Sequence, residues 1–169
     1  MEFLAEVAAF LSDPESWSGS GGIPRRMGEH TYLSLISVAA AAFVALPPAV
    51  WLGHRGRGTV AAVATVNIGR AVPSFGILAI GLVITIEVGL GLGAWPTFIA
   101  LFALAAPPIF TNAITGVQGV DPGVVEAARG MGFTESQLLR RVELPLGLPL
   151  ILEGLRVALL QVIATATLA

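Results

Sequence analysis

Long apolar stretches alternate with short charged stretches along this chain, and the alternation predicts membrane-spanning helices. Residues 31–52 include no charged side chain, and these 22 residues are enough to cross a hydrocarbon core about 30 Å thick as a helix. Three further apolar ranges have a similar or greater length: 59–88, 97–117 and 146–169. Because backbone polar groups must be satisfied inside lipid, the pattern predicts an all-α, polytopic transmembrane helix bundle.

Prolines interrupt the predicted spans at defined places. Pro47 and Pro48 lie in the last third of the first span and should kink it. The range 59–88 is longer than one straight crossing needs, and Pro73 to Gly76 lie at its centre. We therefore expect one crossing here, with a kink or a break between two half-helices.

Two charges, Glu153 and Arg156, lie inside the fourth predicted span. They are three residues apart, so their side chains can pair on one helix face. Because charges are costly inside a bilayer, we expect both to lie near the cytoplasmic surface, in the first turns of the span.

The first thirty residues predict a short helix that does not cross the membrane. Its apolar positions fall on one helical face before Asp13 and Pro14 end it: Phe3, Leu4, Val7, Phe10 and Leu11. Glu2 and Glu6 are unlike the basic start of a signal peptide. We expect an interfacial helix followed by a loop in residues 1–30.

Arginine placement predicts which loops face the cytoplasm, since the chain has nine basic residues and no lysine. The 53–58 loop holds two arginines and the 118–148 loop holds three, while the 89–94 turn holds none. The positive-inside rule then places both basic loops in the cytoplasm. Residues 1–30 become extracytoplasmic despite Arg25 and Arg26, and the membrane domain covers 31–169.

Composition agrees with a multi-pass protein of the cell membrane, embedded in the lipid bilayer. The chain is 55% hydrophobic and only 12% charged, whereas soluble domains have about a quarter charged residues. It has no cysteine, so thiolate metal sites are excluded, and no basic patch suggests nucleic acid. His30 and His54 lie at span ends without a serine beside them. We expect no catalytic residue, no metal site and no cofactor in this chain.

The charged segment between the last two spans predicts a short helix ended by a glycine turn. Asp121 is a good N-cap with Pro122 at the first helical position, and Gly132 can supply the left-handed residue after the helix. Val124, Ala128 and Met131 share one face of this helix.

A second helix is predicted to start at Thr134, because Thr134 and Gln137 have the spacing of a capping box. Pro145 is expected to close the segment. The apolar face of this helix consists of Leu138, Leu139 and Val142. From charge and periodicity alone, the whole segment could also be an amphipathic loop lying on the membrane surface.

A spaced motif in this segment favours a more specific interpretation. Its fixed positions are Glu126, Ala127, Ala128, Gly132, Val142, Leu144 and Pro145. The motif resembles the EAA loop of ABC importer permeases, with Val142 in place of the usual isoleucine. The resemblance implies the fold of a type I importer permease. It also implies that residues 118–145, here called the EAA loop, couple an ATP-hydrolysing partner to the membrane helices.

Three sequence blocks resemble one branch of this family, the permeases for glycine betaine, carnitine, choline and proline. The blocks are VNIGRAVPSFGILAI, APPIFTNAITGVQGVDPGVVEAARGMGF and ATATLA. The resemblance implies three partners: an ABC ATPase subunit, a second permease chain and an extracytoplasmic solute-binding protein. Family permeases have at least one more transmembrane helix, so the resemblance, which covers residues from about 25 to 169, also implies a C-terminally truncated chain.

A polar stripe within the second span leaves an alternative function open. Asn67, Arg70 and Ser74 follow one another at i+3 and i+4, so they share one helical face. Together with Glu87 they could form the pathway of a secondary transporter or proton-linked channel. Arg70 could instead extend to the interface or pair with a neighbouring helix. The alternative leaves the EAA spacing unexplained.

Overall fold

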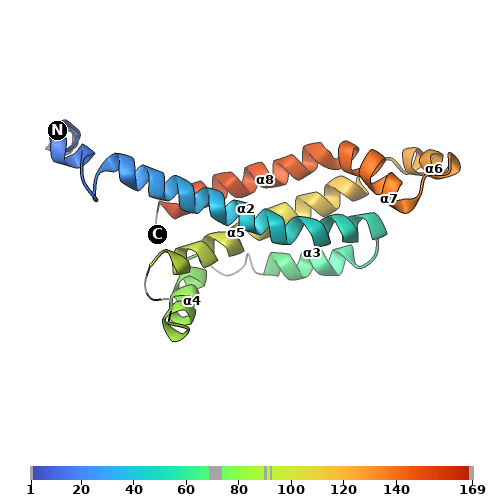
Figure 1. Cartoon of the computed structure of the whole chain (residues 1–169), viewed down its shortest axis with the longest axis horizontal. Helices are drawn as coiled ribbons and strands as arrows, with labels where there is room; N and C mark the ends of the chain where they lie inside the picture. Colours follow the sequence, from blue (N-terminus) through green and yellow to red (C-terminus); the bar gives the residue numbers. More distant parts are fainter. Residues whose placement is uncertain (1, 69–73, 90, 92, 168–169) are drawn as a thin grey trace.

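The computed structural model describes residues 2–68, 74–89, 91 and 93–167. Three long helices pack side by side along one axis: α2 (Ile23–Arg55), α5 (Ala94–Gln118) and α8 (Leu144–Ala166) (Figure 1). Each belongs to a helix that is long and apolar enough to cross a membrane. The prediction of an all-α membrane helix bundle is confirmed.

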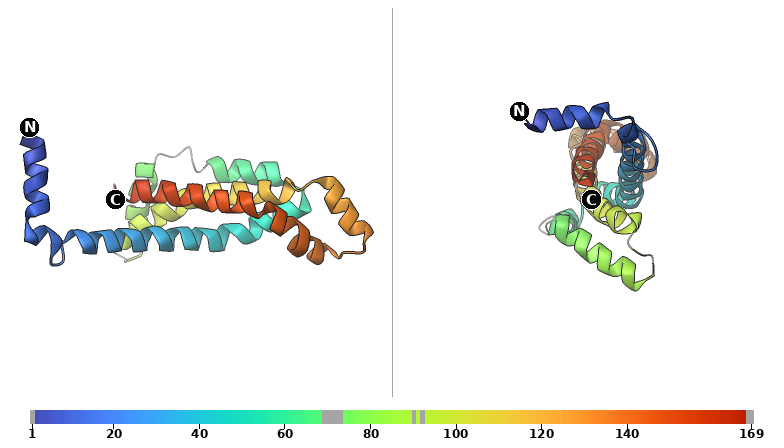
Figure 2. Two further views of the ribbon diagram at one scale, coloured as in Figure 1. Left: turned by 90° about the horizontal axis from the view of Figure 1, so that it is seen from above. Right: turned by 90° about the vertical axis from the view of Figure 1, so that its left-hand side faces the viewer.

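α2 begins earlier than the predicted first span. The chain forms α1 (Glu2–Ser12) and a 3₁₀ turn, η1 (Pro14–Trp17), and then enters α2 at Ile23 rather than continuing as a loop to residue 30. Pro24, in the first turn of α2, explains the early start, because proline has no N–H and is favoured there. α2 stays helical through its two internal prolines, and Figure 2 shows it changing direction toward its C-terminal end.

Small residues let α2 approach α5 closely. Ala41 and Ala49 are fully buried on α2, and a Cβ added at Gly53 would lie 3.0 Å from the Val117 Cβ of α5. Such small side chains are typical of contacts between membrane helices, where van der Waals packing replaces the hydrophobic driving force. α5 lies between α2 and α8 and contributes the larger core side chains: Leu101, Ile109, Phe110 and Ile114.

The predicted second span, 59–88, consists of two helices. α3 (Thr59–Ile68) runs beside the bundle, and α4 (Ser74–Glu87) packs on α5 and projects to one side (Figure 2). Both are apolar, but each is shorter than a membrane crossing needs. Arg70 lies outside the described residues, as does the side chain of Ser74.

The EAA loop leads into α8 without a break. α6 (Pro122–Gly130) and α7 (Glu135–Leu138) are joined by a turn, and a π-helical stretch, η3 (Leu139–Glu143), connects α7 to α8. The prediction that Pro145 closes the segment is therefore wrong. Pro145 lies in the first turn of α8, directly after the π-helical stretch η3. Hydrogen bonds in a π-helix join residues five apart instead of four, so the α-helical pattern is already interrupted where the proline lacks its N–H.

The structure places Glu153 and Arg156 beyond the first turns of α8, which begins at Leu144. The intervening Gly154 packs against Pro108 and Asn112: a Cβ there would lie 2.9 Å from the Pro108 carbonyl oxygen and 2.7 Å from the Asn112 Cβ. Pro108 and Asn112 both lie inside α5, away from its ends. Helical backbone is continuous from α7 through α8, over Glu135–Ala166. Glu153 and Arg156 therefore lie in the middle of a long helix and not at its start.

Candidate functional site

The first helix of the EAA loop has a defined start and end. Asp121 caps α6, since its side-chain Oδ1 accepts a hydrogen bond of 2.7 Å from the Gly123 N–H. At the other end, the Phe133 N–H donates to the Ala128 carbonyl at 3.2 Å, and the Gly132 N–H donates to the Arg129 carbonyl at 2.9 Å. This pair of bonds is the Schellman motif, and Gly132 has the positive φ of +85° that the motif requires.

The second helix starts with the predicted capping box. The Gln137 N–H donates to the Thr134 hydroxyl at 3.3 Å, and the Thr134 N–H donates to the Gln137 side chain at 2.9 Å. Two backbone donors at the helix start are thereby satisfied. The turn between α6 and α7 is held by hydrogen bonds on both sides, so it fixes the angle between the two helices.

The EAA positions do not all face the same way. Ala128 is buried, whereas Glu126 and Ala127 are exposed, and Ala127 lines the groove described below. Met131, predicted on the same apolar face as Ala128, is 72% exposed. Leu138, on the face predicted for the second helix, is fully buried.

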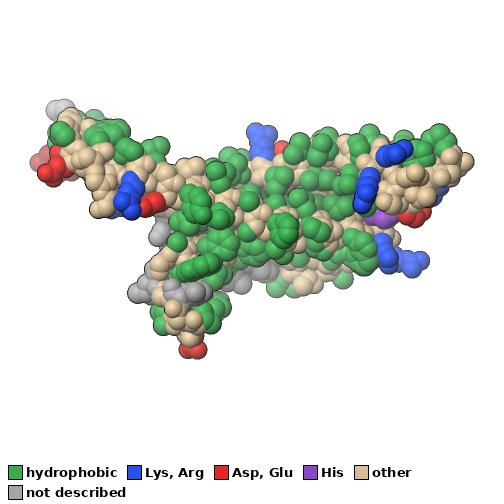
Figure 3. Space-filling view, in the orientation of Figure 1, with side chains coloured by type: hydrophobic (Ala, Val, Ile, Leu, Met, Phe, Trp, Pro, Cys, Tyr) green, Lys and Arg blue, Asp and Glu red, His purple; other side chains and the backbone are tan. Residues whose placement is uncertain are grey.

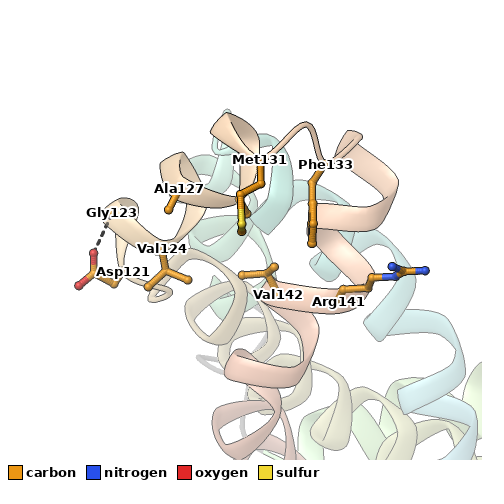
Figure 4. A pocket seen from close by; sticks show the side chains of 9 residues that line it. Asp121, Gly123, Val124, Ala127, Met131, Phe133, Arg141 and Val142 are labelled. Carbon is orange, nitrogen blue, oxygen red and sulfur yellow. Dashed lines mark hydrogen bonds between the residues drawn. The ribbon is translucent and has the colours of Figure 1, made fainter.

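A groove of about 540 Å³ separates α6 from η3. Figure 4 shows Met131 and Phe133 pointing toward Val142 across it, while the Arg141 guanidinium extends away. The groove is open to the surface and mostly apolar. The EAA loop thus offers apolar side chains and an exposed glutamate at the end of the bundle.

His54, at the end of α2, joins the loop to the membrane helices. Its Nδ1 lies 2.5 Å from the Glu143 Oε2, and its Nε2 lies 3.3 Å from the Glu135 Oε2. The side chains of His54 and Glu143 are only 13% and 7% exposed. One imidazole thus connects α2 to both α7 and η3.

Arg129 extends this network to α6. Its Nε and Nη2 atoms each donate to a carboxylate oxygen of Glu135, both at 3.2 Å. These bonds raise the pKa of Arg129 and, together with its charge, lower the pKa of Glu135. We call Arg129, His54, Glu135 and Glu143 the His54 cluster. Sequence analysis did not find the cluster, because His54 and Glu143 are 89 residues apart and no spacing pattern joins them.

The two basic loops meet at one end of the bundle. The His54 contacts join the end of α2 to the EAA loop, and the Gln118 side chain donates to the Thr59 hydroxyl at 3.2 Å. Figure 3 shows basic side chains and a histidine gathered at this end, beside a largely hydrophobic body. Both loops therefore face the same side of any membrane that the bundle crosses.

The predicted pathway residues can be placed only in part. Asn67 lies on α3, and its Oδ1 is buried without a hydrogen-bond partner among the described residues. Arg70 and the side chain of Ser74 lie outside the description. Within the described part of the chain, histidine, aspartate and glutamate side chains form no group that could hold a metal ion.

Comparison with known proteins shows the family. Residues 34–169 match the model of the binding-protein-dependent transport system inner membrane component. The chain belongs to this family. The family description agrees with the three helices that are long and apolar enough to cross a membrane.

Individual relatives support the same family. The glycine betaine/carnitine/choline transport system permease protein OpuCB of Bacillus subtilis is 37% identical over 152 residues, which is 90% of this chain and 68% of the relative. The choline transport system permease protein OpuBB of the same organism is 38% identical over 83% of this chain and 63% of the relative. The osmoprotectant import permease protein OsmY of Salmonella typhimurium is 34% identical over 83% of this chain and 58% of the relative. The chain therefore spans about two thirds of the length of these relatives.

Proposed function

We propose that this chain is the permease subunit of an ATP-driven importer for osmoprotectants of the glycine betaine, choline, carnitine or proline type. The observation that best supports the proposal is the EAA loop, whose motif residues form a capped helix, a glycine turn and a second capped helix at the basic end of the bundle. Relatives whose names include these solutes cover most of the chain.

Three partners follow from this proposal. An ABC ATPase subunit binds the exposed face of the EAA loop, where Glu126 and Ala127 point outward beside the apolar groove. A second permease chain completes the solute path. An extracytoplasmic solute-binding protein delivers solute to the opposite end, in agreement with the family's description as a binding-protein-dependent system. The chain itself performs no hydrolysis.

The His54 cluster gives the proposed coupling a physical route. When the ATPase subunit moves α6, the Arg129–Glu135 bonds move α7, and His54 passes the displacement to the end of α2. η3 and α8 follow, because His54 also holds Glu143. Continuous helical backbone from α7 through α8 transmits the same movement into the membrane.

A glycine substitution tests the coupling role of the EAA loop. Gly132→Val places a β-branched side chain at a positive φ, which costs about 1–2 kcal/mol and misdirects α7. We expect normal abundance in the membrane but a several-fold loss of solute-stimulated ATP hydrolysis in full-length complexes reconstituted with the ATPase subunit and the solute-binding protein.

Gly130→Val is the matched control. An added Cβ meets nothing within 4 Å at either glycine, but Gly130 is a helical residue without positive φ. The control should keep its stimulated hydrolysis. Unchanged stimulation in the Gly132→Val variant would mean that this loop has no coupling function.

A further inference from the structure

An ion pair stands on the face of α8 that is turned away from α2 and α5. The Arg156 Nη1 lies 3.6 Å from the Glu153 Oε2, and the two side chains are 73% and 48% exposed. Figure 3 shows basic and acidic side chains together on an otherwise hydrophobic part of the bundle, over α8. Leu152 and Leu160, on the same helix, are 53% and 60% exposed.

The helix lengths predict that this pair lies at the depth of the bilayer interior. Gly154, between the two residues, packs against Pro108, which lies ten residues before the end of α5. At 1.5 Å per residue, Pro108 is about 15 Å from that end, which is half of a hydrocarbon core about 30 Å thick. The other charged side chains of α2, α5 and α8 lie close to the helix ends: Arg25, Arg26, Glu29 and Arg55.

Lipid is a poor environment for this face. Charged side chains at mid-membrane depth almost always face protein or a water-filled cavity, and they mark solute or ion pathways. Within the described part of the chain, neither Glu153 nor Arg156 makes a hydrogen bond. The 3.6 Å contact is therefore the interaction that holds the two charges, and it leaves most donors of the guanidinium and most acceptors of the carboxylate free.

We propose that Glu153 and Arg156 form a charged site on the solute path, and that the site binds a small zwitterion. This inference rests on the proposed import function. The guanidinium of Arg156 takes the carboxylate of the solute through paired N–H donors, and the carboxylate of Glu153 lies against its quaternary ammonium group.

Charge balance explains why a zwitterion fits better than a cation. A zwitterion that enters between the two side chains gives each charge a new partner of opposite sign. A solute with a cationic group alone pairs with Glu153 but leaves the Arg156 guanidinium unpaired in a low-dielectric environment, which is costly. The site therefore favours glycine betaine and carnitine, which have both charges, over choline, which lacks the carboxylate.

Uptake of two solutes tests the selectivity. In full-length transporter complexes with their ATPase and binding protein, we expect Arg156→Gln to lower glycine betaine uptake at least tenfold and choline uptake less than twofold. The matched control is Arg25→Gln, which removes the arginine of a different exposed helical pair, Arg25–Glu29, near the start of α2. It should change neither uptake. An equal loss of both solutes, or no loss of either, would overturn the proposed site.

Water access tests the location separately from the solute. Residues 1–169 include no cysteine, so a cysteine introduced in this part of the chain has no native cysteine competing with it there. A small charged methanethiosulfonate reagent should label an Arg156→Cys variant at least tenfold faster than a Phe43→Cys variant, whose position on α2 is 83% exposed and has no charged residue within one helical turn on that helix. Equal labelling rates would overturn the site. Fast labelling of the Arg156→Cys variant, combined with a wild-type transporter that imports neither solute, would instead disprove the proposed solute class.

Discussion

At the scale of single residues, the contacts between the EAA loop and α2 depend on one histidine. His54 lies within 2.5 Å of Glu143 and 3.3 Å of Glu135, and it is the side chain of α2 that contacts both. Glu143 is 7% exposed, so water cannot readily replace the imidazole as its partner. The positions of α7 and η3 relative to α2 therefore depend on a side chain outside the EAA motif.

His54→Ala should weaken both stability and coupling. The variant leaves a nearly buried carboxylate without its partner, which costs about 1–3 kcal/mol. We expect a lower thermal unfolding temperature in detergent and reduced solute-stimulated ATP hydrolysis, both measured on the full-length protein in its complex.

His30→Ala is the matched control, since His30 lies toward the opposite end of α2 and, within the described part of the chain, forms no hydrogen bond or ion pair with the EAA loop. A double-mutant cycle with Glu143→Ala isolates the pair. If the effects of His54→Ala and Glu143→Ala on stability simply add, the contact has no energetic role.

At the scale of elements, α5 and α8 approach each other backbone to backbone where Gly116 faces Gly147. A Cβ added at Gly147 would lie 2.6 Å from the Gly116 carbonyl oxygen, and one added at Gly116 would lie 2.7 Å from the Gly147 carbonyl oxygen. No flexible side chain can move aside at this crossing. The close approach fixes where α8 enters the bundle directly after the EAA loop.

Gly147→Ala should separate these two helices. A methyl group at this crossing overpacks the contact and costs about 1–3 kcal/mol. The expected result is a lower thermal unfolding temperature of the purified protein and weaker assembly with the ATPase subunit.

Gly28→Ala provides the comparison, because Gly28 is also helical but a Cβ there meets nothing within 4 Å. That variant should be neutral or stabilised by up to about 1 kcal/mol through helix propensity. Equal stability of both variants would contradict the close packing of α5 on α8.

At the scale of the whole molecule, the charges divide the bundle into two ends. The basic loops and the His54 cluster meet at one end, while residues 2–17 extend from the other (Figure 2). The positive-inside rule predicts that the end with the basic loops is cytoplasmic. That orientation would place the EAA loop where ATP is available.

Two single-cysteine variants measure the orientation. Ser18→Cys and Ser136→Cys are conservative changes at exposed positions, one near each end. A membrane-impermeant maleimide should label the Ser18→Cys variant in intact cells and the Ser136→Cys variant only after the membrane is opened. Labelling of the Ser136→Cys variant in intact cells would reverse the assignment.

The sequence by itself determined the local structure and the family. The apolar pattern predicted a helical membrane bundle, since every backbone group inside lipid must be bonded within its own segment. Asp121, Gly132 and Thr134 predicted the ends of α6 and the start of α7, because caps and glycine turns depend on neighbours in the chain. Motif spacing identified the family that the match to residues 34–169 then showed.

Only the tertiary structure decided what depends on contacts between distant segments. The pairing of His54 with Glu143 has no local signal, because packing of α2 against η3 brings the two together. The contact of Gly154 with Pro108 sets the level of Glu153 and Arg156 relative to α5. Hydropathy alone gave only the position of the two residues along their own helix. Helix ends are set by neighbouring residues, but the level at which two helices cross is set by the shapes of both surfaces.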